Sequence, residues 1–171
     1  PNLYLNCPPI LNRIHAVKSY RLLKAKNKTS NASSIVEKPT LFASIASIKG
    51  SHYIAIPEYS SESRKYIPML YLDKEVIASN KLYMVDDGSL YEFGVLESNV
   101  HMAWMKTFGG KLESRYAYSS GFVYNTFPWP KPTVLQKTKI EKTAKAILDT
   151  RAKYKCISLG DLYSPKRMQV L

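Results

Sequence analysis

A run of prolines at alternate positions near residue 130 constrains the fold of this chain more than any other feature. Pro128, Pro130 and Pro132 follow one another with a single residue between them. Proline has no amide hydrogen and clashes with the preceding helical turn, so this spacing disfavours both a helix and a continuous strand. The run therefore predicts two segments: a domain over residues 1–128 and a smaller, helical segment over residues 129–171.

The first segment is expected to have an α+β fold, with a mixed, mostly antiparallel sheet and packed helices. His52–Ile56 is rich in β-forming residues and precedes Pro57, as is typical of a strand and its end. Leu82–Val85 leads into Asp86-Asp87-Gly88, which we interpret as a hairpin turn. Further elements are expected as a helix at 17–24, a polar loop at 26–34, a strand or short helix at 39–45, and short strands at 66–72 and 76–78.

A helix is predicted to follow Ser98 or Asn99, either of which can cap it, and to end near Phe108. Val100, Trp104 and Phe108 recur at helical spacing and are expected to form its buried stripe. Residues 111–118 then predict one extended segment. Its alternation would place Lys111, Glu113 and Arg115 on the same side.

The second segment opens with a helix signature. Thr133 and Gln136 stand three apart, as a capping box requires, and the helix is expected to reach Lys153. Its apolar face is predicted to consist of Ile140, Ala144, Ile147 and Leu148. Leu159–Tyr163 predicts a further short helix before Pro165.

The chain is strongly basic, with 25 Lys and Arg against 13 Asp and Glu and a formal net charge of +12. Basic residues interleaved among 13 tyrosines are typical of a surface that meets a polyanion. Duplex DNA is one such partner. The alternatives are RNA or single-stranded nucleic acid stacked on the tyrosines, or simply a solvated basic surface.

The sequence contains no residue pattern that supports a metal site, a catalytic nucleophile or a cofactor site. The two cysteines, Cys7 and Cys156, and three scattered histidines have no zinc-binding spacing, and we interpret both cysteines as free thiols. His101 is expected to be a packing residue. No nucleophile and base stand at a catalytic spacing, and no glycine-rich turn suits a cofactor. A hydrolase using Asp86 and Asp87 remains a third class of function.

The ends of the chain also carry expectations. No signal peptide and no apolar run long enough to span a membrane are present. Because the chain starts at Pro1 and not at Met, we expect a piece of a longer protein. Asn6-Cys7-Pro8-Pro9-Ile10 is only a chance match to the Asn/Asp-Pro-Pro-aromatic motif of nucleic-acid amino-methyltransferases, because Cys7 interrupts it and Ile10 replaces the aromatic.

Two stretches could contact DNA directly. If residues 111–115 face a major groove, Glu113 can accept from cytosine N4 while Arg115 donates to guanine O6 and N7. The alternative is a surface ion pair of little energetic value. Residues 60–65 carry hydroxyls and basic groups that suit phosphate contacts, or they form a polar turn.

A family resemblance adds to these patterns. Over about residues 38–171, the sequence resembles the target recognition domain, and the start of the C-terminal helical region, of MmeI-like Type IIL restriction-modification enzymes and their adenine-N6 methyltransferase relatives. The residues that carry the resemblance are Tyr91–Ser98, His101–Trp104, Gly110–Tyr116, Tyr118-Ser119 and, as the most specific marker, Val123–Pro130.

The resemblance implies a non-catalytic module that chooses the DNA sequence. In that family, the same polypeptide carries an adenine-N6 methyltransferase core, which binds S-adenosylmethionine, and often an endonuclease domain. We therefore expect duplex DNA and the methyltransferase core as partners, no cofactor within this chain, no membrane association, and the cytoplasm of a bacterium or archaeon as the location.

The resemblance also assigns site residues. Glu113 and Arg115 match the two positions that read one base pair in the family, where other members carry the swapped Lys and Asp. Further base-reading positions are implied near Asn80, Lys81 and Ala117. Backbone contacts are expected from Lys111, Ser60, Ser61, Arg64 and Lys65. Ser63 departs from the family, whose members usually carry Arg there.

Overall fold

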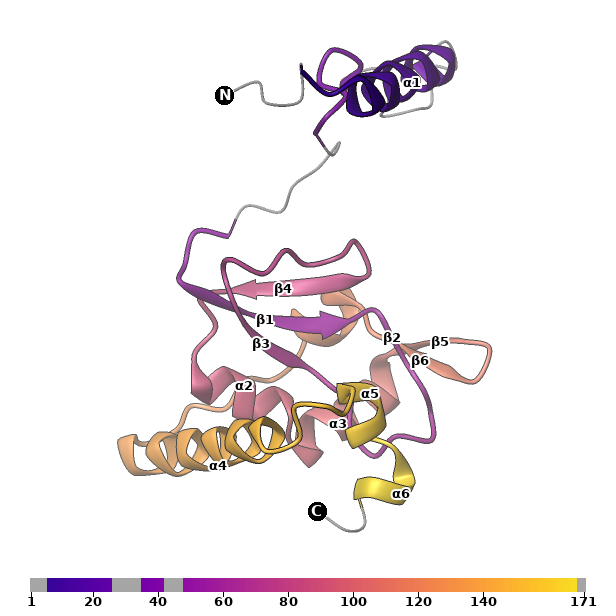
Figure 1. Cartoon of the computed structure of the whole chain (residues 1–171). Helices are drawn as coiled ribbons and strands as arrows, with labels where there is room; N and C mark the ends of the chain where they lie inside the picture. The colour runs from indigo at the N-terminus through magenta and orange to yellow at the C-terminus, as the bar shows by residue number, and fades with distance from the viewer. Residues whose placement is uncertain (1–5, 26–34, 42–47, 169–171) are drawn as a thin grey trace. The chain divides into compact units, whose positions relative to one another are not determined.

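The computed structural model describes residues 6–25, 35–41 and 48–168. The chain divides into two compact units, Pro1–Ser47 and Ile48–Leu171, which Figure 1 shows in their order along the chain. The loop expected at 26–34 lies outside the described residues, as do residues 42–45 of the element expected at 39–45.

The first unit contains one long helix, α1 (Pro8–Ala25), which is longer than the helix expected at 17–24. Proline suits the first turn of a helix, where its missing amide hydrogen has no intrahelical partner anyway, and this explains the start at Pro8. The guanidinium of Arg21 donates to the carbonyl oxygens of Ile35 and Lys38, at 3.1 and 2.8 Å. Arg21 therefore connects α1 to the described segment at 35–41, as does the ion pair of 2.7 Å between Lys18 and Glu37.

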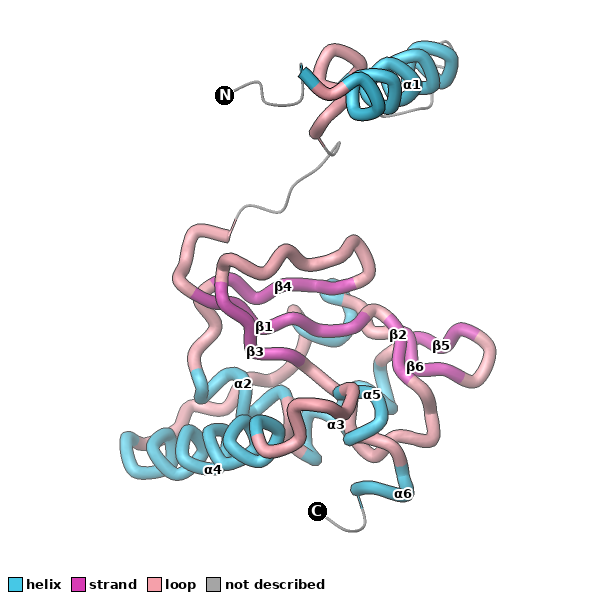
Figure 2. The backbone as a smooth tube through the Cα atoms, in the orientation of Figure 1, coloured by secondary structure: helices cyan, strands magenta, loops and turns pink. Residues whose placement is uncertain are grey.

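The centre of the second unit is a three-stranded antiparallel sheet, coloured magenta in Figure 2. In it, β1 (His52–Pro57) lies between β3 (Leu70–Asp73) and β4 (Leu82–Asp86). The strand predicted at 52–56 is confirmed, and residues 53–56 are all buried, so side chains on both faces of β1 are covered.

Two predicted strands are corrected. The one expected at 66–72 begins only at Leu70, because the amide of Met69 donates to the Glu97 carboxylate, at 2.9 Å, and not to a neighbouring strand. Residues 76–78 are irregular, and the carbonyl of Val76 accepts a hydrogen bond of 2.8 Å from the Tyr53 hydroxyl. Side-chain partners thus replace strand pairing at both places.

The turn after β4 is not a hairpin. Asp87 adopts the left-handed φ of 53°, and the chain passes into α2 (Leu90–Leu96), which starts at a capping box formed by Ser89 and Glu92. The Asp-Gly pair signalled a turn correctly, but capping chemistry three residues further on selects a helix as the next element.

The next helix, α3 (Asn99–Phe108), is confirmed together with its Ser98 cap, but the stripe predicted to be buried is wrong. Val100 and Phe108 are 69% and 52% exposed, whereas His101, Met102 and Met105 are buried. Two neighbouring stripes of this helix have similar spacing. The buried stripe is the one that contains His101, whose ring packs edge-to-face on the ring of Phe127 with centroids 4.7 Å apart.

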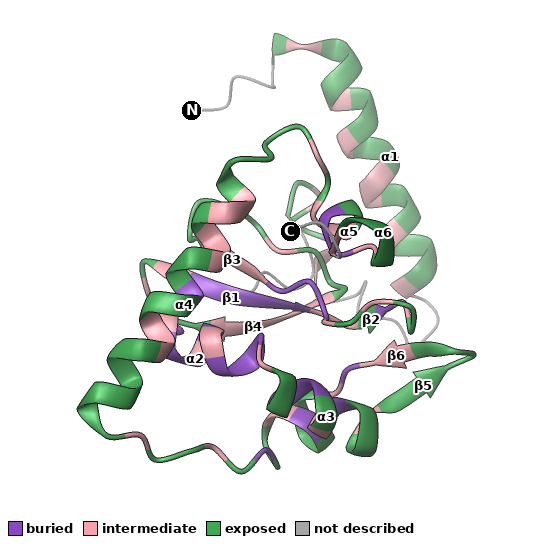
Figure 3. Cartoon of the chain, turned by 90° about the horizontal axis from the view of Figure 1, so that it is seen from below, coloured by how far each residue is buried: buried purple, intermediate pink, exposed green. Residues whose placement is uncertain are grey.

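A second small sheet has the order β2 (Tyr59–Ser60), β6 (Arg115–Ala117) and β5 (Gly110–Leu112). The single extended segment expected at 111–118 is therefore wrong, because β5 and β6 fold back on each other as an antiparallel hairpin. This hairpin projects from the body of the unit at the end opposite α4 (Figures 1 and 3). Figure 3 shows its turn as exposed and β1 as buried.

The remaining elements are helical: the π-helix η3 (Ser120–Tyr124), α4 (Val134–Ala152), α5 (Leu159–Leu162) and α6 (Pro165–Met168). The capping box of α4 is confirmed, and so is its apolar face, since Ala144 is buried and the other three residues are half-buried. The short helix before Pro165 is confirmed as α5, whereas α6 was not predicted. Among the described residues, no helix is long and apolar enough to cross a membrane.

A buried polar cluster joins the last helices to α2. The Glu97 carboxylate accepts hydrogen bonds from the Arg151 guanidinium of α4 and from the Tyr163 hydroxyl next to α5, each at 2.8 Å. Arg151 also donates to the carbonyl oxygen of Met69, at 2.7 Å. Because the Glu97 side chain is only 2% exposed, its charge depends on these partners.

Candidate nucleic-acid interface

The turn of the β5–β6 hairpin carries the two strongest base-reading candidates. Leu112 pairs with Arg115, so Glu113 and Ser114 form a two-residue turn. Glu113 has a φ of 58°, at the first central position, where turns of this kind favour glycine. A carboxylate-bearing residue thus holds a backbone conformation that L-residues rarely adopt, and such positions cluster at functional sites.

The side chains of Glu113 and Arg115 meet at this turn. Arg115 Nη2 donates to Glu113 Oε2 at 2.7 Å, and the two side chains are 75% and 48% exposed, respectively. The ion pair leaves Glu113 Oε1 and most of the guanidinium N–H groups unpaired among the described residues. Both side chains therefore face solvent and can form further hydrogen bonds with a ligand.

The hairpin register corrects the expected alternation. Residues paired across two strands share a face, so Arg115 lies on the face of Leu112, while Lys111 lies with Tyr116 on the opposite face. Ala117 lies two positions from Arg115 and shares its face. The fold therefore groups Arg115 with Ala117, and it separates both from Lys111.

Asn80 and Lys81 reach the same end of the unit through a neighbouring segment. The amide of Glu58 donates to the carbonyl oxygen of Lys81 at 3.0 Å, and Lys81 Nζ lies 3.1 Å from the Glu58 carboxylate. Tyr59, the next residue, pairs with Ala117. All five base-reading candidates thus lie on or beside the second sheet and its adjoining loop.

The pKa values at this end reflect its mixed charge. The Glu58 carboxylate, through its hydrogen bond and its charge, raises the pKa of the Lys81 ammonium. The pKa of Glu62 is lowered, first by its own backbone amide, then by the Ser114 hydroxyl and the charges of Arg115 and Lys111. The Glu62 carboxylate therefore lies within the electrostatic influence of the hairpin turn. Neither Glu58 nor Glu62 was predicted as a site residue, although Glu62 lies within the loop at 60–65 that the sequence singled out.

The loop at 60–65 supports its expected phosphate contacts only in part. Lys65 is exposed and Ser61 is half-buried, and Lys65 Nζ lies 5.6 Å from the centre of the Tyr66 ring. Ser60 is only 4% exposed, and its buried hydroxyl does not suit it to a phosphate. Arg64 is half-buried and donates to the carbonyl oxygen of Gly160 at 3.4 Å. Arg64 is thus partly engaged with α5.

Other candidates have structural roles. The Asp86 carboxylate accepts hydrogen bonds from the amides of Lys49 and Gly50, at 3.0 and 3.1 Å, and these lower its pKa. A carboxyl held ionised in this way is unsuited to act as a general acid. His101 Nε2 lies 3.0 Å from the Tyr118 hydroxyl, and burial lowers the pKa of His101 to about 4. The expectation that His101 is a packing residue is confirmed.

The tyrosines are divided between the core and the surface, where Tyr20, Tyr59 and Tyr154 are exposed. Tyr53, Tyr91, Tyr118 and Tyr163 belong to the buried core. Their hydroxyls find partners inside the fold, for example the carbonyl oxygen of Pro130 for Tyr91. The single-strand alternative is less favoured, because protein covers these four rings and they cannot stack on bases.

Fold and surface together define a recognition module: an α+β domain that presents paired charged side chains on an exposed hairpin, with no cluster of potential metal ligands among its described residues. The chain belongs to the MmeI target recognition domain family, which matches residues 1–131. The MmeI C-terminal domain family matches residues 133–170. The matched range includes residues 1–37, to which the resemblance seen in the sequence did not extend.

Two relatives are informative. DNA methyltransferase A of Bacillus subtilis (strain 168) is 39% identical over 120 residues, which make up 70% of this chain and 14% of that protein. The structure of the Type IIL restriction-modification enzyme MmeI in complex with DNA is similar with 41% identity and a TM-score of 0.81, over 92% of this chain and 21% of that one. This chain therefore spans only a small part of each relative.

Proposed function

We propose that this chain reads the base sequence of duplex DNA for a methyltransferase or restriction-modification enzyme. The observation that carries the proposal is the hairpin turn with its outward-facing Glu113 and Arg115, which lies beside Ala117, Lys81 and Asn80 at one end of the unit. A relative was solved in complex with DNA, which supports DNA as the partner of this chain.

The Glu113–Arg115 pair suits a single G·C base pair. The guanidinium N–H groups not used by Glu113 fork onto guanine O6 and N7, and Glu113 Oε1 accepts from cytosine N4. The ion pair at 2.7 Å already brings the two side chains together before DNA arrives, which reduces the side-chain entropy lost on binding. Discrimination against the wrong base is expected to be about 1–3 kcal/mol.

Affinity is assigned to other residues. Lys111 lies on the opposite face of the hairpin from Arg115, so it faces a phosphate backbone when the turn enters the groove. Ser61 and Lys65, in the loop whose Glu62 carboxylate lies within the electrostatic influence of the turn, extend this contact. Arg64 and Ser60 are not included, because one is bonded to Gly160 and the other is buried.

The chemistry belongs to the rest of the polypeptide. We assign S-adenosylmethionine and the transfer to an adenine amine to a core outside these residues, because the chain lacks a glycine-rich cofactor turn. Residues 1–128 then act as the recognition domain and residues 129–171 as the start of a helical region. A base-reading surface held against the duplex would position one adenine to be flipped into that core, in the cytoplasm of a prokaryotic cell.

The experiment exchanges the proposed readers. The full-length protein is given a pool of randomised duplexes, and the bound or methylated fraction is sequenced. Glu113→Lys with Arg115→Asp is expected to reverse the preference at one base pair from G·C to the opposite orientation and to leave the other positions unchanged. Asp149→Lys with Lys145→Asp, an exposed ion pair of 2.8 Å on α4, is the matched control. An unchanged preference at every position in the hairpin variant contradicts the assignment.

A further inference from the structure

The π-helix η3 presents the exposed side chain of Phe122 on a backbone that hydrogen bonds hold in place. The amide of Phe122 donates to the Ser119 hydroxyl at 3.4 Å, and its carbonyl oxygen accepts from the Thr126 hydroxyl at 2.7 Å. The amide of Val123 donates to the Ser119 carbonyl oxygen at 2.9 Å. Side chains therefore fix the backbone of Phe122 on both sides, so its position does not depend on packing of its own ring.

The residues around Phe122 point the other way. Val123 is fully buried and Tyr118 is 2% exposed, whereas Phe122 is 73% exposed. Single exposed apolar residues are common on protein surfaces and need no explanation by themselves. Phe122 differs because a rare helical form presents it, and π-helical turns occur frequently at functional sites.

Its surroundings connect η3 with the proposed base readers. A hollow of about 340 Å³ separates η3 from β4 and is lined by Tyr83 and Met84 on one side and by Ser120 and Tyr124 on the other. Tyr83 also lines the adjoining hollow at Asn80 and Lys81. η3 follows β6 with only Tyr118 and Ser119 between them. Phe122 thus lies on the element that follows the hairpin and shares a hollow with β4.

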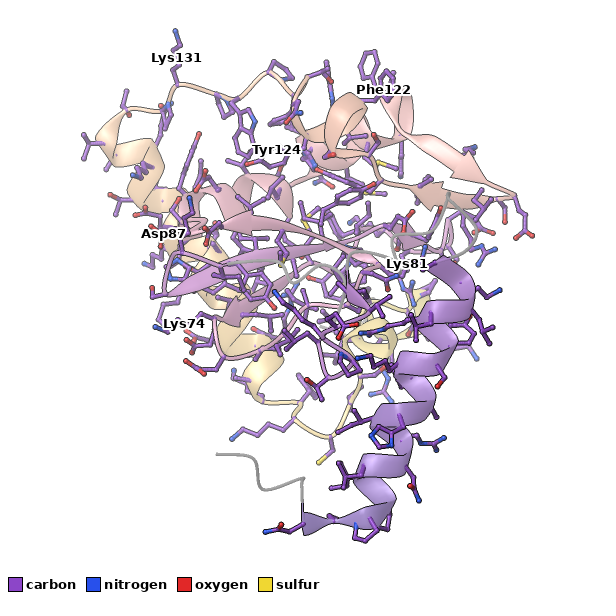
Figure 4. All side chains as sticks on the ribbon, turned by 90° about the horizontal axis from the view of Figure 1, so that it is seen from above. Lys74, Lys81, Asp87, Phe122, Tyr124 and Lys131 are labelled. Atoms are coloured by element: carbon purple, nitrogen blue, oxygen red, sulfur yellow. The ribbon has the colours of Figure 1, made fainter. Side chains whose placement is uncertain are left out.

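Figure 4 shows the position of Phe122 from above. Phe122 lies at the edge of the unit with its ring directed away from the ribbon, while Tyr124 lies further inward. The ring has no polar atom, so its exposed face has no hydrogen-bonding role. What it offers is a flat apolar surface on the element that follows the proposed groove-reading hairpin.

We propose that Phe122 inserts between stacked bases next to the pair read by Glu113 and Arg115, and so kinks or opens the duplex at that step. Apolar side chains of this kind act as wedges at DNA base steps in other proteins. A fixed backbone suits this task, because the wedge must not fold back when it meets the stack. The inference rests on the proposed DNA-reading function and assigns it a means of deforming the duplex.

The test places 2-aminopurine at each position of the duplex that the full-length protein selects. Wild-type protein is expected to raise the fluorescence at one step, where unstacking occurs. Phe122→Ala removes that signal and weakens duplex binding by roughly tenfold, the order of loss given by one stacked aromatic side chain. Phe122→Leu, which is still a wedge, keeps the signal. Val134→Ala, at a site that is 86% exposed on α4, is the matched control and changes neither.

Two results overturn the wedge. One is selective binding by wild-type protein with an unchanged signal and affinity in Phe122→Ala, which leaves the proposed function intact. The other is a lower melting temperature of Phe122→Ala without DNA, with unchanged 2-aminopurine signals, which assigns the ring to a protein contact. Failure of the wild-type protein to prefer any duplex refutes both proposals together.

Discussion

The left-handed backbone at Glu113 allows recognition and stability to be separated by one substitution. A φ of 58° destabilises the folded state by about 1–2 kcal/mol for a residue that has a Cβ atom, and glycine avoids this strain. Glycine in turn gives the unfolded chain more conformational freedom, worth about 0.4–1 kcal/mol. Glu113→Gly is therefore expected to unfold with a free energy about 1 kcal/mol higher than Glu113→Ala.

The two variants share every other loss. Both remove the carboxylate and its ion pair with Arg115, a surface pair worth about 0.2–1 kcal/mol. Both are therefore expected to lose the same preference, about 1–3 kcal/mol at one base pair. Urea unfolding of the chain measures the first difference, and sequencing of duplexes selected from a random pool measures the second.

A control for the backbone argument lies elsewhere in the same unit. Asp87 has a φ of 53° but lies at the turn between β4 and α2, away from the hairpin. Asp87→Gly compared with Asp87→Ala should show the same sign of stability difference and no change in sequence preference. Equal unfolding free energies for Glu113→Gly and Glu113→Ala would refute the strain argument, and retained preference in both would refute the reading role.

Three further predictions follow from charge and burial. If about four to six phosphates are neutralised, a plot of log K against log salt concentration for duplex binding should have a slope of about −0.9 per phosphate, and a flat plot would contradict DNA as the partner. Because the folded pKa of His101, about 4, lies below the unfolded value, the unfolded state binds the extra proton. The free energy of unfolding should therefore fall by about 3 kcal/mol as the pH drops from 6.5 to 4. His101→Gln should remove this pH-dependent loss. Urea unfolding at a series of acidic pH values measures both. Arg151→Met leaves the buried Glu97 without its cation and should cost about 3–5 kcal/mol in urea unfolding; a loss below about 1 kcal/mol would contradict that account.

Local chemistry was enough to predict several elements. The Ser98 cap, the Thr133–Gln136 capping box and the strand ended by Pro57 each depend on residues within a few positions of one another. The nature of the candidate site was predictable in the same way, since Glu113 and Arg115 stand two apart and their complementary chemistry is visible in the sequence. Base-reading itself remains a prediction.

Long-range pairing decided the rest. Tyr59 joins Ala117 across more than fifty residues, and this pairing, which no local pattern encodes, brings Lys81 to the hairpin. The alternation at 111–115 looked like one strand because a two-residue turn at Glu113 lacks the glycine that would have signalled it.

The sequence by itself determined the fold class, the helix caps and the family, because each rests on short-range chemistry or on a specific motif. Only the tertiary structure decided which stripe of α3 is buried, which side of the hairpin Lys111 occupies, and that Arg64 turns to Gly160. These are choices between locally equivalent alternatives, and the packing of distant segments supplies the free-energy difference between them.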